Sequence, residues 1–243
     1  MTGEFIAIAV AIFAVALLYS SVGHAGASGY IAVLALSGLA VEEIRPVALT
    51  LNILAAAVGF CQWWRAGHFV WSLFWPFMLL AAPAAFFGGW LRVPGDYLKI
   101  VLGLVLWFSA WRLLRRGENP SAVSRPPRPV AIASGAGLGF LSGLTGTGGG
   151  IFLTPLLLFC RWAKVKEAAA VSSLFILVNS ASGLAGFAGS GRELPGFAWP
   201  LACVVAVGGF LGSRLGSHHL PARGIARLLA LVLLIAGTKL LFG

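Results

Sequence analysis

The sequence predicts an all-α polytopic membrane protein that contains an inverted internal repeat, with five helical segments in each half. The composition is the first observation: 59% of the 243 residues are apolar, only 10% are charged, and the mean hydropathy is +0.95. Soluble domains carry about 25% charged residues. The other two observations are apolar runs separated by short polar breaks, and residue patterns that return in the second half. Together they exclude an ordinary cytosolic enzyme, a disordered chain and a nucleic-acid-binding domain.

Apolar runs of helical length follow one another along the chain. In the first half they cover residues 5–22, 29–40, 47–64, 69–91 and 97–114. In the second half they cover residues 130–145, 150–160, 168–187, 197–216 and 225–242. A helix needs about 20 apolar residues to cross a bilayer, so we expect short or broken helices at 29–40 and 150–160, after Gly-rich loops. The runs 5–22 and 29–40 either cross separately or form a hairpin that turns inside the membrane.

A sustained polar, Pro-rich stretch at residues 115–129 divides the chain. Such a composition is typical of a linker. We therefore expect an N-terminal repeat at residues 1–114, a cytoplasmic linker at 115–129 and a C-terminal repeat at 130–243.

The two halves share uncommon residues in the same order. At an offset of 124 positions, Trp75-Pro76 falls on Trp199-Pro200 and Gly88 falls on Gly212. Matches between Leu and Val mean little in such a composition, but a Trp-Pro pair kept in order with a glycine indicates an internal duplication. Internal duplication is the usual architecture of a secondary transporter.

The topology explains the net charge of +10. Cytoplasmic loops of membrane proteins are enriched in Lys and Arg. With a cytoplasmic linker and five segments in each half, twelve of the 17 Lys and Arg residues lie on the cytoplasmic side. The other five are Arg45, Arg92, Lys99, Arg192 and Lys239. If each short segment instead entered the membrane and returned to its own side, eight Lys and Arg residues would lie on the cytoplasmic side and nine on the outer side. We therefore expect the 5+5 arrangement, with both termini outside.

The densest irregular segments lie at equivalent places, since Ser21–Gly29 aligns with Ser142–Gly150 at an offset of 121 positions. Each follows one apolar run and opens a short one. Glycine lets the backbone bend and approach a ligand closely, and a helix N-terminus carries about +0.5 charge. Two short helices that begin inside the membrane could therefore bind an anion without a cationic side chain. The alternative is a helix-packing seam of small residues.

The candidate substrate-binding residues come from both segments and from the helices that follow them. They are Gly23, His24, Gly26, Ser28, Gly29, Asn52, Thr145, Gly146, Thr147, Gly148, Gly149, Gly150, Ser172, Ser173 and Asn179. His24, an ionisable side chain well inside an apolar stretch, either binds an anion, carries a proton, or is a neutral histidine satisfied by a helix carbonyl. Asn52 and Asn179 either face the site or form interhelical hydrogen bonds.

Several kinds of chemistry find no support in the sequence. All seven Asp and Glu residues stand at the ends of the apolar runs or between them, which disfavours a carboxylate proton relay or a sodium site. The sequence contains no Walker motif and no Cys/His cluster, so we expect no ATP drive, no cofactor and no metal. We expect the three cysteines to be buried.

At the glycine-rich turns the chain resembles the TauE/SafE-type permeases, also called the 4-toluene sulfonate uptake permease family. The run Gly143–Gly150 followed by Pro155 is similar to that family's GxxGxGGG…P signature. The first half, with Gly23–Tyr30, Arg45-Pro46 and Asn52, departs from the signature and resembles one branch of the family. The resemblance covers nearly the whole chain. It implies a multi-pass inner-membrane transporter of sulfur-containing anions such as sulfite or organosulfonates.

We expect a secondary transporter of such anions that works by alternating access. Export is the expected direction, because the membrane potential drives anions outward with about 2.3 kcal/mol per charge per 100 mV.

An anion channel, or a carrier of another small carboxylate or oxyanion, is the alternative. An intramembrane enzyme that uses His24 is a remote one, since no GxSxG-type nucleophile motif accompanies it, and we expect no enzymatic activity. The expected partners are a small anionic substrate and the lipid bilayer, with no nucleic acid; homo-oligomer formation stays open.

Overall fold

The computed structural model describes residues 2–37, 41–91, 122–191 and 198–242, together with eight residues between 103 and 114. The described elements are α1 (Thr2–Ser20), α2 (Ala27–Leu36), α3 (Val41–Arg65), α4 (Trp71–Trp90), α6 (Arg128–Thr145), α7 (Gly150–Phe159), α8 (Val165–Gly189), α9 (Ala198–Arg214), the π-helical turn η1 (Leu215–His219) and α10 (Ala222–Phe242). No strand occurs among these residues. The all-α prediction is confirmed.

The lengths of the helices separate spanning from non-spanning elements. Five described helices are long and apolar enough to cross a membrane: Gly3–Ser20, Glu43–Arg65, Trp71–Trp90, Val165–Gly189 and Trp199–His219. Helices α2 and α7 have only ten residues each, which gives about 15 Å of helix, half of a bilayer core. The short helices expected after the glycine-rich loops are therefore confirmed, and the protein is a multi-pass membrane protein.

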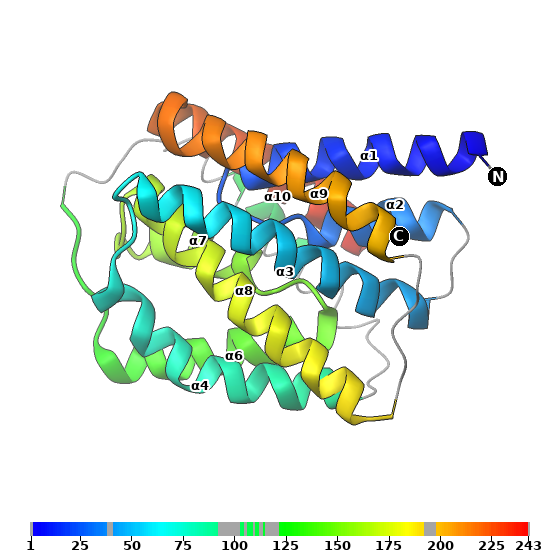
Figure 1. Cartoon of the computed structure of the whole chain (residues 1–243). Helices are drawn as coiled ribbons and strands as arrows, with labels where there is room; N and C mark the ends of the chain where they lie inside the picture. The colour runs from blue at the N-terminus through cyan, green and yellow to red at the C-terminus, as the bar shows by residue number, and fades with distance from the viewer. Residues whose placement is uncertain are drawn as a thin grey trace.

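The helices form three layers (Figure 1). Helices α3 and α8 cross in the middle layer, α4 and α6 lie side by side on one face, and α1 and α9 lie on the other. Each outer layer therefore pairs an element of the first half with an element of the second half.

Each short helix folds back on the helix before it. Gly29 of α2 lies against the side chains of Val15 and Tyr19 of α1. In the same way, the start of α7 lies against α6, since a Cβ atom on Gly149 would come within 3.1 Å of the Ser142 side chain and 3.4 Å of the Leu138 carbonyl. The structure thus has two hairpins, α1–α2 and α6–α7. The hairpin is the arrangement that this chain adopts for the runs 5–22 and 29–40.

The glycines aligned at an offset of 124 positions have matched contacts. A Cβ atom on Gly88 of α4 would collide with the carbonyl of Phe140 in α6, and one on Gly212 of α9 would collide with the carbonyl of Leu17 in α1. Helix α4 therefore holds the α6–α7 hairpin while α9 holds the α1–α2 hairpin. This exchange between the halves is compatible with an inverted repeat. The repeat boundaries at 114 and 130 stay predictions.

Two segment boundaries differ from the sequence prediction. Helix α3 begins at Val41 rather than at 47, because Pro46 lies inside the helix instead of before it. A proline near a helix start removes few backbone hydrogen bonds, so the helix continues through it. Helix α8 begins at Val165 rather than at 168, where the Glu167 carboxylate accepts the Lys164 backbone N–H at 3.2 Å. The segment 97–114, apart from isolated residues, and residues 115–121 of the linker lie outside the described residues.

The expectation of buried cysteines is wrong. Cys61, Cys160 and Cys203 are all exposed at the surface of the protein. Cys61 and Cys203 lie on helices that can span the membrane, and a thiol behaves as a small, weakly polar hydrophobe. Lipid can therefore replace the protein interior as their surroundings.

Candidate anion-binding site

The first glycine-rich turn, residues 21–26, is buried inside the bundle. It ends at Gly26, whose φ of 107° lies in the left-handed region that favours glycine. A Cβ atom on Gly23 would collide with the backbone of Ala169 in α8. The turn from the first half therefore lies directly on the long central helix of the second half.

The second turn, residues 146–149, connects α6 to α7 and is also buried. Helix α7 begins after Gly149, where φ is 80°. A Cβ atom on Gly148 would come within 2.7 Å of Ile176 and 2.8 Å of the Ser180 hydroxyl. Gly146 lies beside the side chain of Arg45. This turn is therefore enclosed by the two central helices, α3 and α8.

The side chain of Asn52 on α3 joins both turns. Its Oδ1 accepts the backbone N–H of Ala27, the first residue of α2, at 3.1 Å. Its Nδ2 donates to the Ser180 hydroxyl on α8 at 2.9 Å and to the Thr147 carbonyl at 3.5 Å. The interhelical hydrogen bond considered for Asn52 is therefore present, and the side chain lies between the two turns; a contact with substrate stays a prediction.

His24 makes a second connection between the halves. Its Nε2 lies 2.9 Å from the Thr154 hydroxyl of α7, and that hydroxyl donates to the Ser172 hydroxyl of α8 at 2.6 Å. Since the single proton of Thr154 goes to Ser172, His24 Nε2 is the donor to Thr154. The His24 ring also lies beside Gly150, and its Nδ1 is buried without a hydrogen-bond partner in the described part of the chain. His24 is thus oriented by one ring nitrogen, and its role as a substrate-binding residue stays a prediction.

Two further buried polar groups near the second turn lack partners among the described residues. The amide of Asn179, with an exposed fraction of 0%, makes no hydrogen bond through either atom, and the Ser142 hydroxyl makes none. On α8, Asn179 follows Phe175 by one turn, and Phe175 and Ser142 meet beside Gly149. A buried polar group without a partner costs about 1–3 kcal/mol. An unsatisfied amide at this place is therefore a candidate ligand-binding group.

Four other predicted residues contact either the neighbouring helix of the same half or their own helix. Ser28 and Gly29 lie in the first turn of α2 and pack on α1. The hydroxyls of Thr145 and Ser173 each donate to a carbonyl of their own helix at 2.8 Å. The structure therefore brings together the glycines of the two turns with His24, Asn52 and Ser172, and places these four residues at the edge.

Several residues at the junction, the place where the two glycine-rich turns meet α3 and α8, were not predicted from the sequence. Thr154 and Ser180 supply the partners of His24 and Asn52, and each stands four residues after a residue that lines the turns, which is helical spacing. Arg45 donates to the Gly88 carbonyl at 3.0 Å and also to the Gly143 carbonyl. Its sequence position before a proline gave no signal that the side chain would reach into the bundle.

The geometry defines what the junction can do. Two helix N-termini, from different halves, face a small region lined by hydroxyl, amide and imidazole groups. Such groups can solvate an anion, and the guanidinium of Arg45, whose side chain lies beside Gly146, adds a positive charge near the second turn. Asn52, Ile176 and Ser180 pack closely around the second turn, so the described side chains close the space between the turns. No cluster of three or more His, Cys, Asp or Glu side chains that could hold a metal ion occurs in the parts of the chain that the structure describes.

Comparison with known proteins agrees with this architecture. The family model described as "Sulfite exporter TauE/SafE" matches residues 8–240. The chain belongs to the TauE/SafE family. That family and the multi-pass fold together establish a membrane transporter.

Two curated relatives support the family assignment. A "Probable membrane transporter protein y4hK" of Sinorhizobium fredii is 40% identical over 249 residues, which cover 100% of both chains. A "Probable membrane transporter protein YunE" of Bacillus subtilis is 28% identical over 116 residues, 46% of this TauE/SafE chain and 41% of the relative. No solved structure matches the chain.

Proposed function

We propose that the protein exports small sulfur-containing oxyanions, such as sulfite or an organosulfonate, across the cell inner membrane by alternating access. The observation that carries the proposal is the meeting of two helix N-termini at Asn52, beside the unpartnered amide of Asn179. The substrate would take the place between the turns that the described side chains now close.

Hydrogen bonding explains why an oxyanion fits this place. The first N–H groups of a helix have no partner within the helix, and a sulfite or sulfonate group offers three oxygen acceptors. The Asn179 amide and the Ser142 hydroxyl can add side-chain donors. A bound oxyanion would therefore satisfy groups that are unsatisfied in the closed arrangement.

The charge balance favours outward movement. No Asp or Glu stands among the residues of the two turns, so no carboxylate there can carry a sodium ion or a proton with the anion. The membrane potential alone then drives a negative solute out of the cell, with about 2.3 kcal/mol per charge per 100 mV. His24 could carry a proton with the anion, which would make the flux pH-dependent.

Flux measurements test the proposal. We expect reconstituted proteoliposomes to release loaded sulfite or methanesulfonate with saturable kinetics, and to release it faster when the interior is made negative. Absence of saturable flux of any sulfur oxyanion by correctly folded protein would refute a carrier of this class. Flux that rises linearly with concentration would instead indicate a channel.

The variant Asn179→Leu probes the binding groups directly. Leucine has a similar volume and no unsatisfied polar atoms, so we expect the unfolding temperature to rise or stay the same. Transport should fall at least about tenfold, the equivalent of one lost hydrogen bond of about 1.4 kcal/mol. The control is Ser213→Ala, which removes a buried hydroxyl bonded to its own helix at 2.6 Å. A stabilised Asn179→Leu protein with unchanged transport would contradict a binding role.

A further inference from the structure

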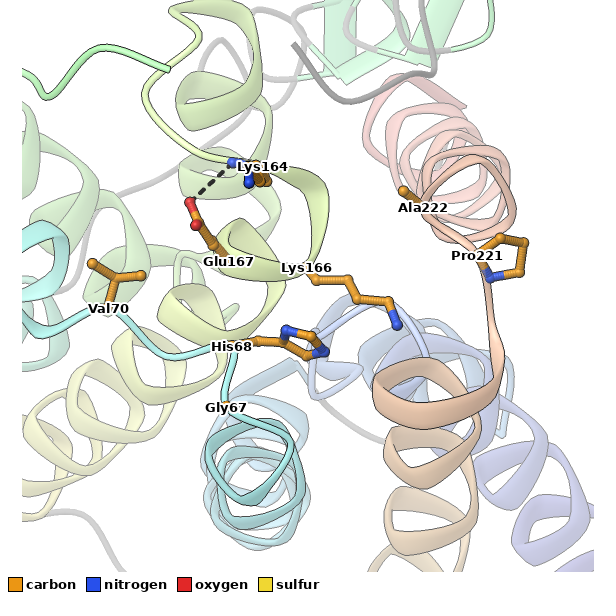
Figure 2. A pocket seen from close by; sticks show the side chains of 8 residues that line it. All are labelled: Gly67, His68, Val70, Lys164, Lys166, Glu167, Pro221 and Ala222. Carbon is orange, nitrogen blue, oxygen red and sulfur yellow. Dashed lines mark hydrogen bonds between the residues drawn. The ribbon is translucent and has the colours of Figure 1, made fainter. Parts of the chain in front are cut away.

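A pocket separate from the two turns lies where three loops meet at one end of the bundle. Its volume is about 460 Å³, and it is bounded by the α3–α4 loop, the start of α8 and the start of α10. Figure 2 shows His68, Lys166 and Pro221 at its wall. All three loops are predicted to be cytoplasmic, so the structure brings residues from both halves together at the face from which an exported anion enters.

The wall of this pocket carries more positive than negative charge. Lys164 and Lys166 bring two ammonium groups, and Glu167 brings one carboxylate. The carboxylate already accepts the Lys164 backbone N–H at 3.2 Å, which Figure 2 marks with a dashed line. The charge of Glu167 remains in the pocket, but the two ammonium groups outnumber it and give the lining a net positive charge.

Lys166 and His68 share a single partner. The Lys166 ammonium donates to the Ser217 carbonyl at 3.1 Å, and His68 Nε2 lies 3.3 Å from the same oxygen. An ammonium has three protons, and Ser217 takes one of them. Two potential cations thus lie around one neutral carbonyl in a half-buried wall, where an anion would be a better partner than water.

The protonation of His68 reflects this environment. Burial is the largest cause that lowers its pKa below the ordinary 6.5, and the charges of Lys166 and His218 lower it further. The Ser217 carbonyl and the Glu167 carboxylate act in the opposite direction but do not compensate. Without an anion, His68 is therefore neutral at pH 7.

We propose that this pocket is an oxyanion-binding site, in which the Lys166 ammonium and the His68 imidazole hold the anion. The oxyanion is either a small free anion or the phosphate of an anionic lipid, since both present the same oxygen acceptors. When the anion binds, His68 gains a negative neighbour and takes up a proton more readily. If the proposed export function is correct, the same site collects substrate at the cytoplasmic face.

A titration of His68 by NMR tests the site without relying on transport. The full-length protein is placed in phosphatidylcholine nanodiscs with and without sulfate, and His68→Gln assigns the resonance. We expect sulfate to raise the pKa of His68 by about one pH unit, as an opposite charge at hydrogen-bonding distance does. Lys166→Gln should abolish this shift, whereas Arg128→Gln, an exposed cation stacked on Trp75 outside the pocket, should not.

A second set of nanodiscs distinguishes the sources of the oxyanion. A raised pKa in phosphatidylglycerol without sulfate identifies the lipid phosphate as the occupant, and a shift that requires sulfate identifies a free anion. No shift in either condition, in protein that elutes as a single folded species, overturns the proposal. Lys164→Gln gives a second test if Lys166→Gln fails to fold, and it should reduce the shift.

Transport kinetics separate this site from the turns. We expect Lys166→Gln to raise KM for export several-fold and to leave kcat unchanged, because it weakens collection of substrate and not its passage. Proteoliposomes without any flux would refute the proposed function while leaving the NMR result intact. A His68 shift that requires sulfate, together with an unchanged KM, would leave the oxyanion site in place and overturn its role in collecting substrate.

Discussion

At the scale of single residues, Asn52 has the largest role in connecting the halves. Its amide bonds to the first turn of α2, to the second glycine-rich turn and to α8. Two of the partners, Thr147 and Ser180, belong to the second half of the chain, whereas Ala27 belongs to the first. Asn52 therefore links the halves and stabilises the closed arrangement of the turns.

Asn52→Ala should have two measurable effects. Loss of the side chain leaves the buried Ala27 N–H without its acceptor, so we expect about 1–3 kcal/mol of destabilisation. Sulfite flux should fall at least about tenfold, because Asn52 is a proposed substrate-binding residue and one lost hydrogen bond of about 1.4 kcal/mol in the transport transition state corresponds to that factor. Thermal unfolding and flux are measured on the same preparations.

Thr50→Val is the matched control for that variant. Thr50 stands on the same helix, and its hydroxyl donates to the Pro46 carbonyl of that helix at 2.9 Å. This variant should retain nearly all of the transport activity. Equal losses in the two variants would mean that the effect of Asn52 is a general disturbance of α3.

The sequence revealed some of these residues but not their partners. Asn52 and His24 stand out because a polar side chain in an apolar run is conspicuous. Their partners, Ser180 and Thr154, lie 128 and 130 positions away. No local pattern encodes such a pairing, since it depends on how α3, α7 and α8 pack. That Asn179 finds no hydrogen-bond partner among the described residues is likewise a property of the packed structure alone.

At the scale of elements, the second turn depends on small residues where α3 and α8 approach it. A methyl group on Gly148 would meet the Asn52 amide, Ile176 and the Ser180 hydroxyl together. These neighbours belong to the two central helices and have little room to move. A side chain larger than that of glycine in this turn would therefore push the two halves apart.

We expect Gly148→Ala to destabilise the protein by about 1–3 kcal/mol, the usual cost of overpacking, and to abolish flux because the Asn52 bonds cannot form. Gly137→Ala is the control, since it lies on α6 with no atom near the added methyl. That variant should be neutral or stabilising by about 0.5–1 kcal/mol. Thermal unfolding distinguishes the two. A fully active Gly148→Ala protein would contradict the close packing of the second turn against α3 and α8.

Element types were easier to predict than their ends. Ten apolar residues between polar breaks can form only a short helix, so α2 and α7 followed from their length. The start of α3 did not, because Pro46 resembles a helix boundary and is in fact inside the helix. The hairpin geometry also had to come from the structure, since a hairpin and two full crossings return the chain to the same face.

At the scale of the whole molecule, the loops gather as the charge count predicts. The α3–α4 loop, the start of α8 and the η1–α10 connection enclose one pocket. The backbone of Ser124 donates to the Arg161 carbonyl at 3.0 Å, which brings the end of the linker to the α7–α8 loop. One end of the bundle therefore carries the segments assigned to the cytoplasm.

Labelling of single cysteines tests this sidedness. In a background with Cys61, Cys160 and Cys203 replaced by serine, we expect Ser124→Cys to react with a membrane-impermeant thiol reagent only in inside-out vesicles. Ser190→Cys, in the turn after α8, should react only in right-side-out cells or spheroplasts. The opposite pattern would invert the assigned topology, and labelling of both positions from one side would contradict the five-segment count.

Which helices lie together could not be predicted from sequence. The repeat was visible from Trp75-Pro76 and Trp199-Pro200, but nothing near Gly88 or Gly212 indicates that each would pack on a hairpin of the opposite half. That choice is tertiary, because many helices in this chain present small residues to their neighbours.

The direct backbone contacts at Gly88 and Gly212 carry an implication for ancestry. Gly88 of α4 packs on α6, and Gly212 of α9 packs on α1. Each glycine-bearing helix is therefore covered by a hairpin of the other half. Two half-length polypeptides in antiparallel orientation would make the same contacts, with each one covering the glycine-bearing helix of the other. These contacts are therefore compatible with an origin of the chain from such a pair by duplication and fusion.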